Sequence, residues 1–325
     1  MAEKQLMIID CDAGIDDAQA IMMALCQPHI EVVAITCVAG NVSVQRVCHN
    51  VLRVLEVCGK LGKVPVYRGA EGPIINRGDP PATSVHGSDG LGDIPSSGAL
   101  ELEKHASAEH AVNKMIDLVV HQHHGEISLV ALGPLTNLAL AERMKPGFSK
   151  QLKMLSLFGG NTEGRGNTTI SAEFNFYMDV EAADIVLQEF VCPVYVTGWE
   201  ASLKHTIDWE WLYEWLNTKT KKGRFVKAVM DHLLQYYKGE WAQNELGEES
   251  NFIVCDQLSM AIAIDDKVVK KAHRHLVRVE RQGSITRGQM VVDWCRHLGH
   301  KDNLNLVTEI DMQLVKDLMQ ASLND

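Results

Sequence analysis

The alternation of short apolar runs with helical patterns is the feature that most limits how this chain can fold. Residues 6–9 and 30–38 are apolar runs typical of buried strands, and each precedes a segment with apolar residues at helical spacing. Similar runs recur at 64–67, 127–132, 154–158 and 193–196. Strands that alternate with helices pair in parallel through right-handed crossovers. The sequence therefore predicts an α/β protein with a mostly parallel, Rossmann-like central sheet flanked by helices.

The pattern changes after about residue 205. Aromatic residues predict helices at 209–215 and 225–237, residues 274–280 and 289–292 predict an antiparallel pair, and 311–323 predicts a final amphipathic helix. Earlier in the chain, helices are expected at 16–26, 43–58, 108–121 and 180–189, and Pro134 is expected to occupy the first position of another. Neither a linker nor a repeat divides the sequence, so we predict one domain over 1–325 with a helical elaboration after 205.

Composition limits the class of partner and the compartment. The 325 residues carry 31 basic and 42 acidic side chains, a net charge of −11 that argues against nucleic acid polymers and anionic membranes as partners. The eight cysteines show no CxxC or zinc-site spacing, which predicts buried free thiols in a reducing compartment. No apolar run approaches the ~20 residues of a membrane span. We therefore expect a cytoplasmic protein.

The segment after the first predicted strand, DCDAGIDD, is the clearest chemical signal. It places four carboxylates within eight residues, at Asp10, Asp12, Asp16 and Asp17. Carboxylates that share a cleft repel one another, and a hard divalent cation such as Ca²⁺ or Mg²⁺ removes that cost. The alternative is a helix-capping aspartate with solvated neighbours, but four such residues together favour a metal site.

Polar groups also follow later strands, where open α/β sheets bind ligands. Asn41 follows the second strand, and the backbone carbonyl of Leu132 follows the fourth. A loop after the fifth carries amides and a carboxylate suited to the hydroxyls of a polyol. His86, alone in a glycine-rich loop, is also consistent with a structural role. The candidates in these later segments are Asn41, His86, Leu132, Asn167, Glu173, Asn175 and Asp256.

Together these segments resemble the inosine–uridine-preferring nucleoside hydrolase family. The resemblance rests on DCDAGIDD, GN at 40–41, HGSDGLG at 86–92, LGPLTNLA at 132–139, GN at 166–167, AEFN at 172–175 and Asp256, in that order. It implies the nucleoside hydrolase fold and a Ca²⁺-dependent enzyme of purine or pyrimidine salvage. Such an enzyme cleaves the N-glycosidic bond of a ribonucleoside with water, and a homodimer or homotetramer is implied.

The resemblance also implies roles for individual residues. Asp12 would be both a calcium ligand and the general base that activates water, with Asp17, Asp256 and the Leu132 carbonyl as further ligands. Asp10 would support the site from behind. The ribonucleoside would be held by Asp16 and Asn175 at the 2′- and 3′-hydroxyls, by Asn167 and Glu173 at the 5′-hydroxyl, and by Asn41. Attack on the face opposite the base would invert the anomeric carbon.

One position departs from the family. Many members have His beside the last metal-binding Asp as the acid for the leaving base, and this chain has Cys255. A thiol is an unusual acid because its pKa is ~8.5, and a buried packing thiol is the alternative. The acid for the leaving base could instead be His86 or a residue on the helices after 205. The base could also leave without an acid. We predict that the segment 217–251 is a mobile flap. The sequence does not indicate which nucleobase is preferred.

Two other functions fit parts of the sequence. The substitution by Cys255 is compatible with a Ca²⁺-dependent nucleoside- or ribose-binding protein that has lost catalysis. An apolar strand followed by DxDxG also resembles the haloacid dehalogenase-type phosphatases, with Asp10 as nucleophile and Asp12 as acid. That family expects Thr or Val where Gly14 stands, and the only late acidic pair, Asp265-Asp266, does not follow a clear strand end.

Overall fold

A computed structural model describes residues 4–75, 85–95, 102–239, 244, 251–299, 302 and 304–325. Nine strands form its central sheet, and every neighbouring pair is parallel except β10 with β13. This confirms the predicted α/β class. In spatial order the strands are β10 (Val269–His275), β13 (Leu304–Ile310), β7 (Val194–Thr197), β6 (Met154–Phe158), β5 (Ile127–Ala131), β1 (Gln5–Cys11), β2 (Ile30–Cys37), β3 (Val66–Arg68) and β4 (Ala106–Ser107).

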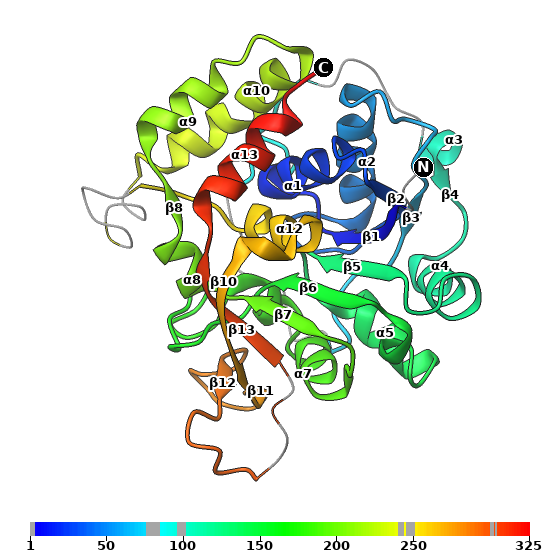
Figure 1. Ribbon diagram of the computed structural model, residues 1–325, viewed down its shortest axis with the longest axis vertical. Coiled ribbons are helices and arrows are strands. Elements are labelled where there is room, and N and C mark those ends of the chain that lie inside the picture. The colour runs from blue at the N-terminus through cyan, green and yellow to red at the C-terminus, as the bar shows by residue number, and fades with distance from the viewer. Residues whose placement is uncertain are drawn as a thin grey trace.

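Helices cover both faces of the sheet (Figure 1). Successive side chains of a strand point to opposite faces of the sheet and so divide the core in two. Met7, Ile9 and Cys11 join one apolar cluster, whereas Ile8 joins the other. The first cluster packs under α1 (Ile15–Leu25), α2 (Val44–Val57), α12 (Asp256–Ile264) and α13 (Met312–Ser322). The second packs under α4 (Ala111–Ile116), α5 (Thr136–Met144) and α7 (Val180–Glu189). The sheet is therefore buried on both sides, as parallel sheets are.

The elaboration after residue 205 is helical, as predicted. It contains α9 (Trp209–Leu216) and α10 (Lys221–Tyr236), and β8 (Thr206–Ile207) pairs antiparallel with β9 (Phe252–Ile253). Trp209, Tyr237 and Phe252 pack ring against ring and tie α9, α10 and β9 together. Residues 240–243 and 245–250 of the predicted flap lie outside the described residues, so its mobility stays a prediction.

The described residues also contain several short elements. They are α3 (Leu102–His105), α6 (Phe174–Met178), α8 (Trp199–Lys204), a π-helical turn at Asp117–Gln122, and 3₁₀ turns at Ser149–Gln151 and Asp266–Val268. The predicted antiparallel pair is confirmed as β11 (Val277–Val279) with β12 (Met290–Val292). Within the described ranges, no helix has the length and apolar character needed to cross a membrane. All eight cysteines are free thiols as predicted, but only four are buried: three are half-buried and Cys295 is exposed.

One predicted helix start is wrong. Pro134 does not open α5, which begins at Thr136 with Leu135 as the flanking residue. Leu132 is still bonded to the sheet, since its N–H donates to the Asp10 carbonyl, and the first helical hydrogen bond joins Ala139 to Leu135. The chain therefore needs residues 133 and 134 to turn out of the sheet before the helix can begin.

Candidate active site

A cavity of about 340 Å³ opens at the carboxyl ends of the central strands, under α10 and β9. It lies where open parallel sheets place ligands. The structure brings every residue that the sequence assigned to the site into the lining of this cavity: Asp12, Asp16, Asp17, Asn41, His86, Leu132, Asn167, Glu173, Asn175, Cys255 and Asp256. Residues from near both ends of the chain therefore share one cavity.

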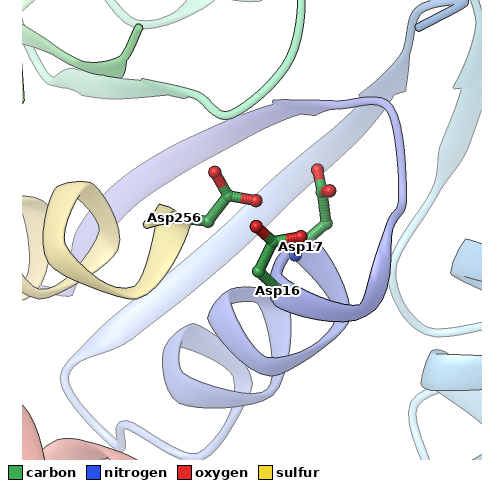
Figure 2. A group of neighbouring side chains, drawn as sticks. All are labelled: Asp16, Asp17 and Asp256. Carbon is green, nitrogen blue, oxygen red and sulfur yellow. Dashed lines mark hydrogen bonds between the residues drawn. The ribbon is translucent and has the colours of Figure 1, made fainter. Parts of the chain in front are cut away.

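Three carboxylates converge in this cavity. Asp16 and Asp17 lie in the first turn of α1, and Asp256 is the first residue of α12. One oxygen atom of each lies within 4.8 Å of those of the other two. Figure 2 shows Asp256 reaching from α12 toward the start of α1. The sequence had assigned Asp16 to the substrate, and its position makes it a candidate metal ligand as well.

Asp12 is held beside this cluster by its backbone surroundings. Its Oδ2 accepts a hydrogen bond of 2.8 Å from the Asn41 N–H. A Cβ atom on Gly40 would stand 2.1 Å from Asp12 Oδ2, and one on Gly133 would stand 2.9 Å from Oδ1, so only glycine fits at either position. The predicted Asn41 thus contributes its main-chain N–H to the orientation of Asp12.

Asp17 is held in a similar way. Its Oδ2 accepts from the Gly14 N–H at 2.8 Å and its Oδ1 accepts from the Asp12 N–H at 3.2 Å. The reach back to Gly14 satisfies an N–H at the start of α1, where carboxylates are also favoured by the helix dipole. The same residue therefore caps the helix and faces the cavity.

Among the described residues, no lysine or arginine lies beside the charges of the cluster. Burial raises the pKa of Asp17 to about 7 and raises the pKa of Asp12 and of Asp256 well above the usual value, and repulsion from the neighbouring carboxylates adds to each shift. No lysine or arginine lines the cavity in the part of the chain that the structure describes. A set of oxygen donors with this charge fits a hard divalent cation.

Asp10 lies behind the cavity and does not line it. Its side chain is fully buried, and its Oδ1 accepts from Thr36 Oγ1 at 2.6 Å and from Asn137 Nδ2 at 2.8 Å. Asn137 also donates to the Cys37 carbonyl and accepts from the Ala70 N–H. These bonds connect the ends of β1, β2 and β3 with the start of α5. Asp10 therefore supports the strand ends that carry the site.

Hydrogen bonds to the backbone fix the side chains of Asn175, Asn167 and Glu173 in the cavity. Asn175 Nδ2 donates to the carbonyls of Leu132 and Phe158, at 2.7 and 3.1 Å, so Oδ1 is the side-chain atom that can accept from a hydroxyl. Asn167 Oδ1 accepts from the Phe174 N–H, which leaves its Nδ2 as the group that can donate. Glu173 caps α6 by accepting from the N–H groups of Asn175 and Phe176, and it also accepts from the Gly160 N–H. These contacts set the direction of each polar group before a ligand binds.

His86 and Cys255 both reach the cavity, and neither has the environment of a strong acid. His86 Nδ1 accepts from the Ile15 N–H at 3.1 Å, so the proton of the neutral ring lies on Nε2, and burial lowers the pKa of this histidine. Cys255 packs against the cluster formed by Phe158, Trp199 and Ile253. Burial, followed by the nearby Asp16 charge, raises the pKa of its thiol well above the usual value. The acid for the leaving base therefore stays unassigned.

Sequence reasoning missed the apolar part of the lining, which comes from several elements. We call the following residues the aromatic wall: Phe158, Phe174, Trp199, Tyr236, Tyr237 and Phe252. Leu233, Ile253, Val85, Thr168 and Gln257 complete the lining. The helical spacing after residue 205 indicated where several aromatic residues would lie along the chain, but apolar side chains pack in cores equally well and give no sign of a ligand.

Comparison with known proteins identifies the family. The sequence pattern of the inosine-uridine preferring nucleoside hydrolases matches residues 7–317. The chain is 34% identical to the inosine-uridine preferring nucleoside hydrolase of Leishmania major, over 88% of this chain and 87% of that protein. It is 33% identical to the pyrimidine-specific ribonucleoside hydrolase RihA of Citrobacter koseri, over 97% of each.

A solved structure agrees with these matches. The inosine-guanosine nucleoside hydrolase IG-NH superimposes with a TM-score of 0.89 and 28% identity, over 98% of each chain. The agreement of fold and sequence over nearly the whole length does not support the phosphatase alternative. The chain therefore belongs to the inosine-uridine preferring nucleoside hydrolase family, and its activity is the hydrolysis of ribonucleosides to free base and ribose.

Proposed function

We propose that this cavity hydrolyses ribonucleosides with Asp12 as the general base and with Ca²⁺ as the metal ion. The observation that carries this proposal is the convergence of Asp16, Asp17 and Asp256 in one cavity with Asp12. The ligands would be Asp12, Asp17, Asp256 and the Leu132 carbonyl, with Asp16 within reach. When bound, the cation supplies positive charge that favours ionisation of water and attracts the oxygen atoms of a diol.

The residues of the chain then have separate tasks. Asp12 takes the proton of the attacking water, and the Asn41 N–H holds its carboxylate in place for that transfer. Asp16 and Asn175 Oδ1 accept from the 2′- and 3′-hydroxyls, and Asn167 and Glu173 bind the 5′-hydroxyl. Holding the sugar at several points fixes the geometry of attack and reduces the entropic part of the barrier.

The aromatic wall completes the substrate site. Its rings offer flat apolar surfaces against which a nucleobase can stack while the ribose faces the carboxylates. The negative groups near the sugar stabilise the positive charge that develops on the ribosyl ring in the transition state. Water activated by Asp12 attacks the face opposite the base, so the product is ribose with an inverted anomeric carbon.

A nucleoside panel tests this proposal. We expect release of reducing sugar from at least one of inosine, guanosine, uridine and cytidine, loss of that release after treatment with a chelator, and recovery with Ca²⁺.

Asp17→Ala removes one metal ligand and is expected to lose metal and activity together. Binding of nucleosides without turnover in every case would support the ribose-binding protein instead, and full activity of Asp17→Ala with no bound metal would refute the site.

The loop that carries Asn167 offers a separate prediction. Glu200 accepts from the N–H groups of Thr162, Glu163 and Arg165 at 2.7, 2.9 and 3.3 Å and so fixes this loop to α8. We expect Glu200→Ala to raise KM by roughly 3- to 10-fold, the worth of about one hydrogen bond, because Asn167 is held less firmly. Steady-state kinetics should show little change in kcat. A fall in kcat with unchanged KM would contradict the assignment of Asn167 to ground-state binding.

Assembly and location stay predictions. The resemblance implies a homodimer or homotetramer, which light scattering of the purified protein can test. The free thiols fit a reducing compartment such as the cytoplasm, and fluorescence microscopy of the tagged chain can test that location.

A further inference from the structure

We propose that Gln19 and Gln257 are positioning residues that fix α1 against α12, so that the carboxylates at the two helix starts meet. This inference rests on the proposed function, because it assigns a role toward the cation of that site. Gln19 lies one turn after Asp16 on α1, and Gln257 directly follows Asp256 on α12. Both glutamine side chains are almost fully buried, at 2% and 1% exposure.

A directed chain of hydrogen bonds joins the two residues. Gln257 Oε1 accepts from the Cys255 N–H at 3.0 Å, Gln257 Nε2 donates to Gln19 Oε1 at 2.9 Å, and Gln19 Nε2 donates to Met230 Sδ at 3.0 Å. A backbone N–H can only donate, so the Gln257 oxygen must face Cys255 and its nitrogen must face Gln19. The orientation of the second amide follows from the first. This glutamine pair therefore has one arrangement that satisfies it.

The location of the glutamine pair explains why a hydrogen bond is needed between α1 and α12. One carboxylate oxygen of each of Asp16, Asp17 and Asp256 lies within 4.8 Å of those of the other two, so negative charges held there without a cation push the starts of α1 and α12 apart. An apolar contact would resist separation of the two helices but would allow them to slide. A hydrogen bond between two side-chain amides has a defined direction and therefore fixes the register of the helices. The bond to the Cys255 N–H also fixes the backbone immediately before Asp256.

The chain of hydrogen bonds also reaches the helix that carries part of the aromatic wall. Met230 lies on α10 one turn before Leu233, and Leu233 and Tyr236 of this helix line the cavity. Gln19 thus contacts α12 through its oxygen and α10 through its nitrogen. The carboxylates and the surface that faces the base are positioned by the same two side chains.

Gln257→Met tests the inference, and Gln5→Met is its matched control. Gln5 Nε2 donates to the Ala263 carbonyl at 2.7 Å, so the same substitution removes a side-chain hydrogen bond from the far end of α12. We expect Gln257→Met to weaken Ca²⁺ binding by about 10-fold or more, the usual effect of losing a partner behind a metal site. Gln5→Met should lower Tm while Ca²⁺ affinity stays at the wild-type value. Titration with Ca²⁺ alone, followed by calorimetry and by Tm, measures both.

The double variant Gln19→Met/Gln257→Met separates positioning from stability. Gln257→Met alone leaves both Gln19 Oε1 and the Cys255 N–H without their partner, whereas the double variant leaves only the Cys255 N–H. We therefore expect the double variant to regain part of the lost Tm while its Ca²⁺ affinity stays low, because the register of the helices is still not fixed. At saturating Ca²⁺, kcat should remain reduced in both variants.

The outcomes distinguish this inference from the proposed function. Wild-type Ca²⁺ affinity and kcat in a folded Gln257→Met protein would overturn the positioning role and leave the proposed function intact. Ca²⁺ affinity that recovers together with Tm in the double variant would also overturn it. A wild-type protein that binds Ca²⁺ without turnover would refute the hydrolase, yet the Ca²⁺ titrations would still test the glutamine pair. A wild-type protein that binds no Ca²⁺ would overturn both.

Discussion

The Asp12→Asn protein is expected to lose about 1,000-fold or more in kcat, within the range that general-base catalysis contributes, while it keeps its fold. Asparagine has the shape of aspartate and fits between Gly40 and Gly133. Its Oδ1 must face the Asn41 N–H, because only that atom accepts. The amide nitrogen then faces the cavity and cannot take a proton from water. Single-turnover measurement of ribose release gives the size of the loss.

Asp10→Asn is the matched control for this prediction. Asp10 lies two residues earlier, on β1, is equally buried and does not line the cavity. An asparagine there can still accept from Thr36 and Asn137 through Oδ1. We expect a loss in kcat of less than about 10-fold, since the residue acts only through its neighbours. Equal losses in the two variants would show that burial of an amide at the end of β1 causes both, and would remove Asp12 from its role as base.

Much of the fold and site could be predicted because both depend on local signals. A buried parallel strand is an apolar run, and the residues at its carboxyl end point toward the ligand. Asp12, Asn41 and Leu132 could therefore be picked out as candidates one strand at a time, and the family resemblance then implied their roles. Asp256 could be singled out because an aspartate between two apolar runs needs a partner. The structure places all four in the lining of one cavity.

The rest depends on pairing between distant segments. β13 adds to the sheet in parallel beside β7, and β10 pairs antiparallel with β13, yet the lysines and histidines of β10 hide its strand character. The aromatic wall and the glutamine pair were missed for a related reason. An aromatic ring or a glutamine has no spacing rule that links it to a partner far along the chain, so its role appears only when α8, α10 and α12 meet.

The second large effect is expected for Asp256→Asn, and it has opposite signs for stability and for activity. Ionised Asp17 and Asp256 destabilise the cation-free protein, since burial, and after it the nearby Asp16 charge, raise the pKa of Asp17 to about 7 and that of Asp256 well above its usual value. A folded protein with such carboxyls binds more protons than the unfolded chain, so its stability falls as pH rises from about 4 to 7. Removing one charge weakens that fall.

We therefore expect Asp256→Asn in chelator at pH 8 to melt ~1–2 °C above the wild type, the shift of about 1 kcal/mol in a chain of 325 residues. Ca²⁺ should no longer raise its Tm, and kcat/KM should fall by more than about 100-fold. Asp265→Asn, at the other end of α12, should change neither response. Nucleoside hydrolysis at the wild-type rate together with a wild-type Ca²⁺ response would separate Asp256 from the metal site. A lower Tm in chelator would instead mean that Asp256 stabilises the start of α12 more than it repels Asp16 and Asp17, and the convergence of charge in this cavity would no longer account for the need for a cation.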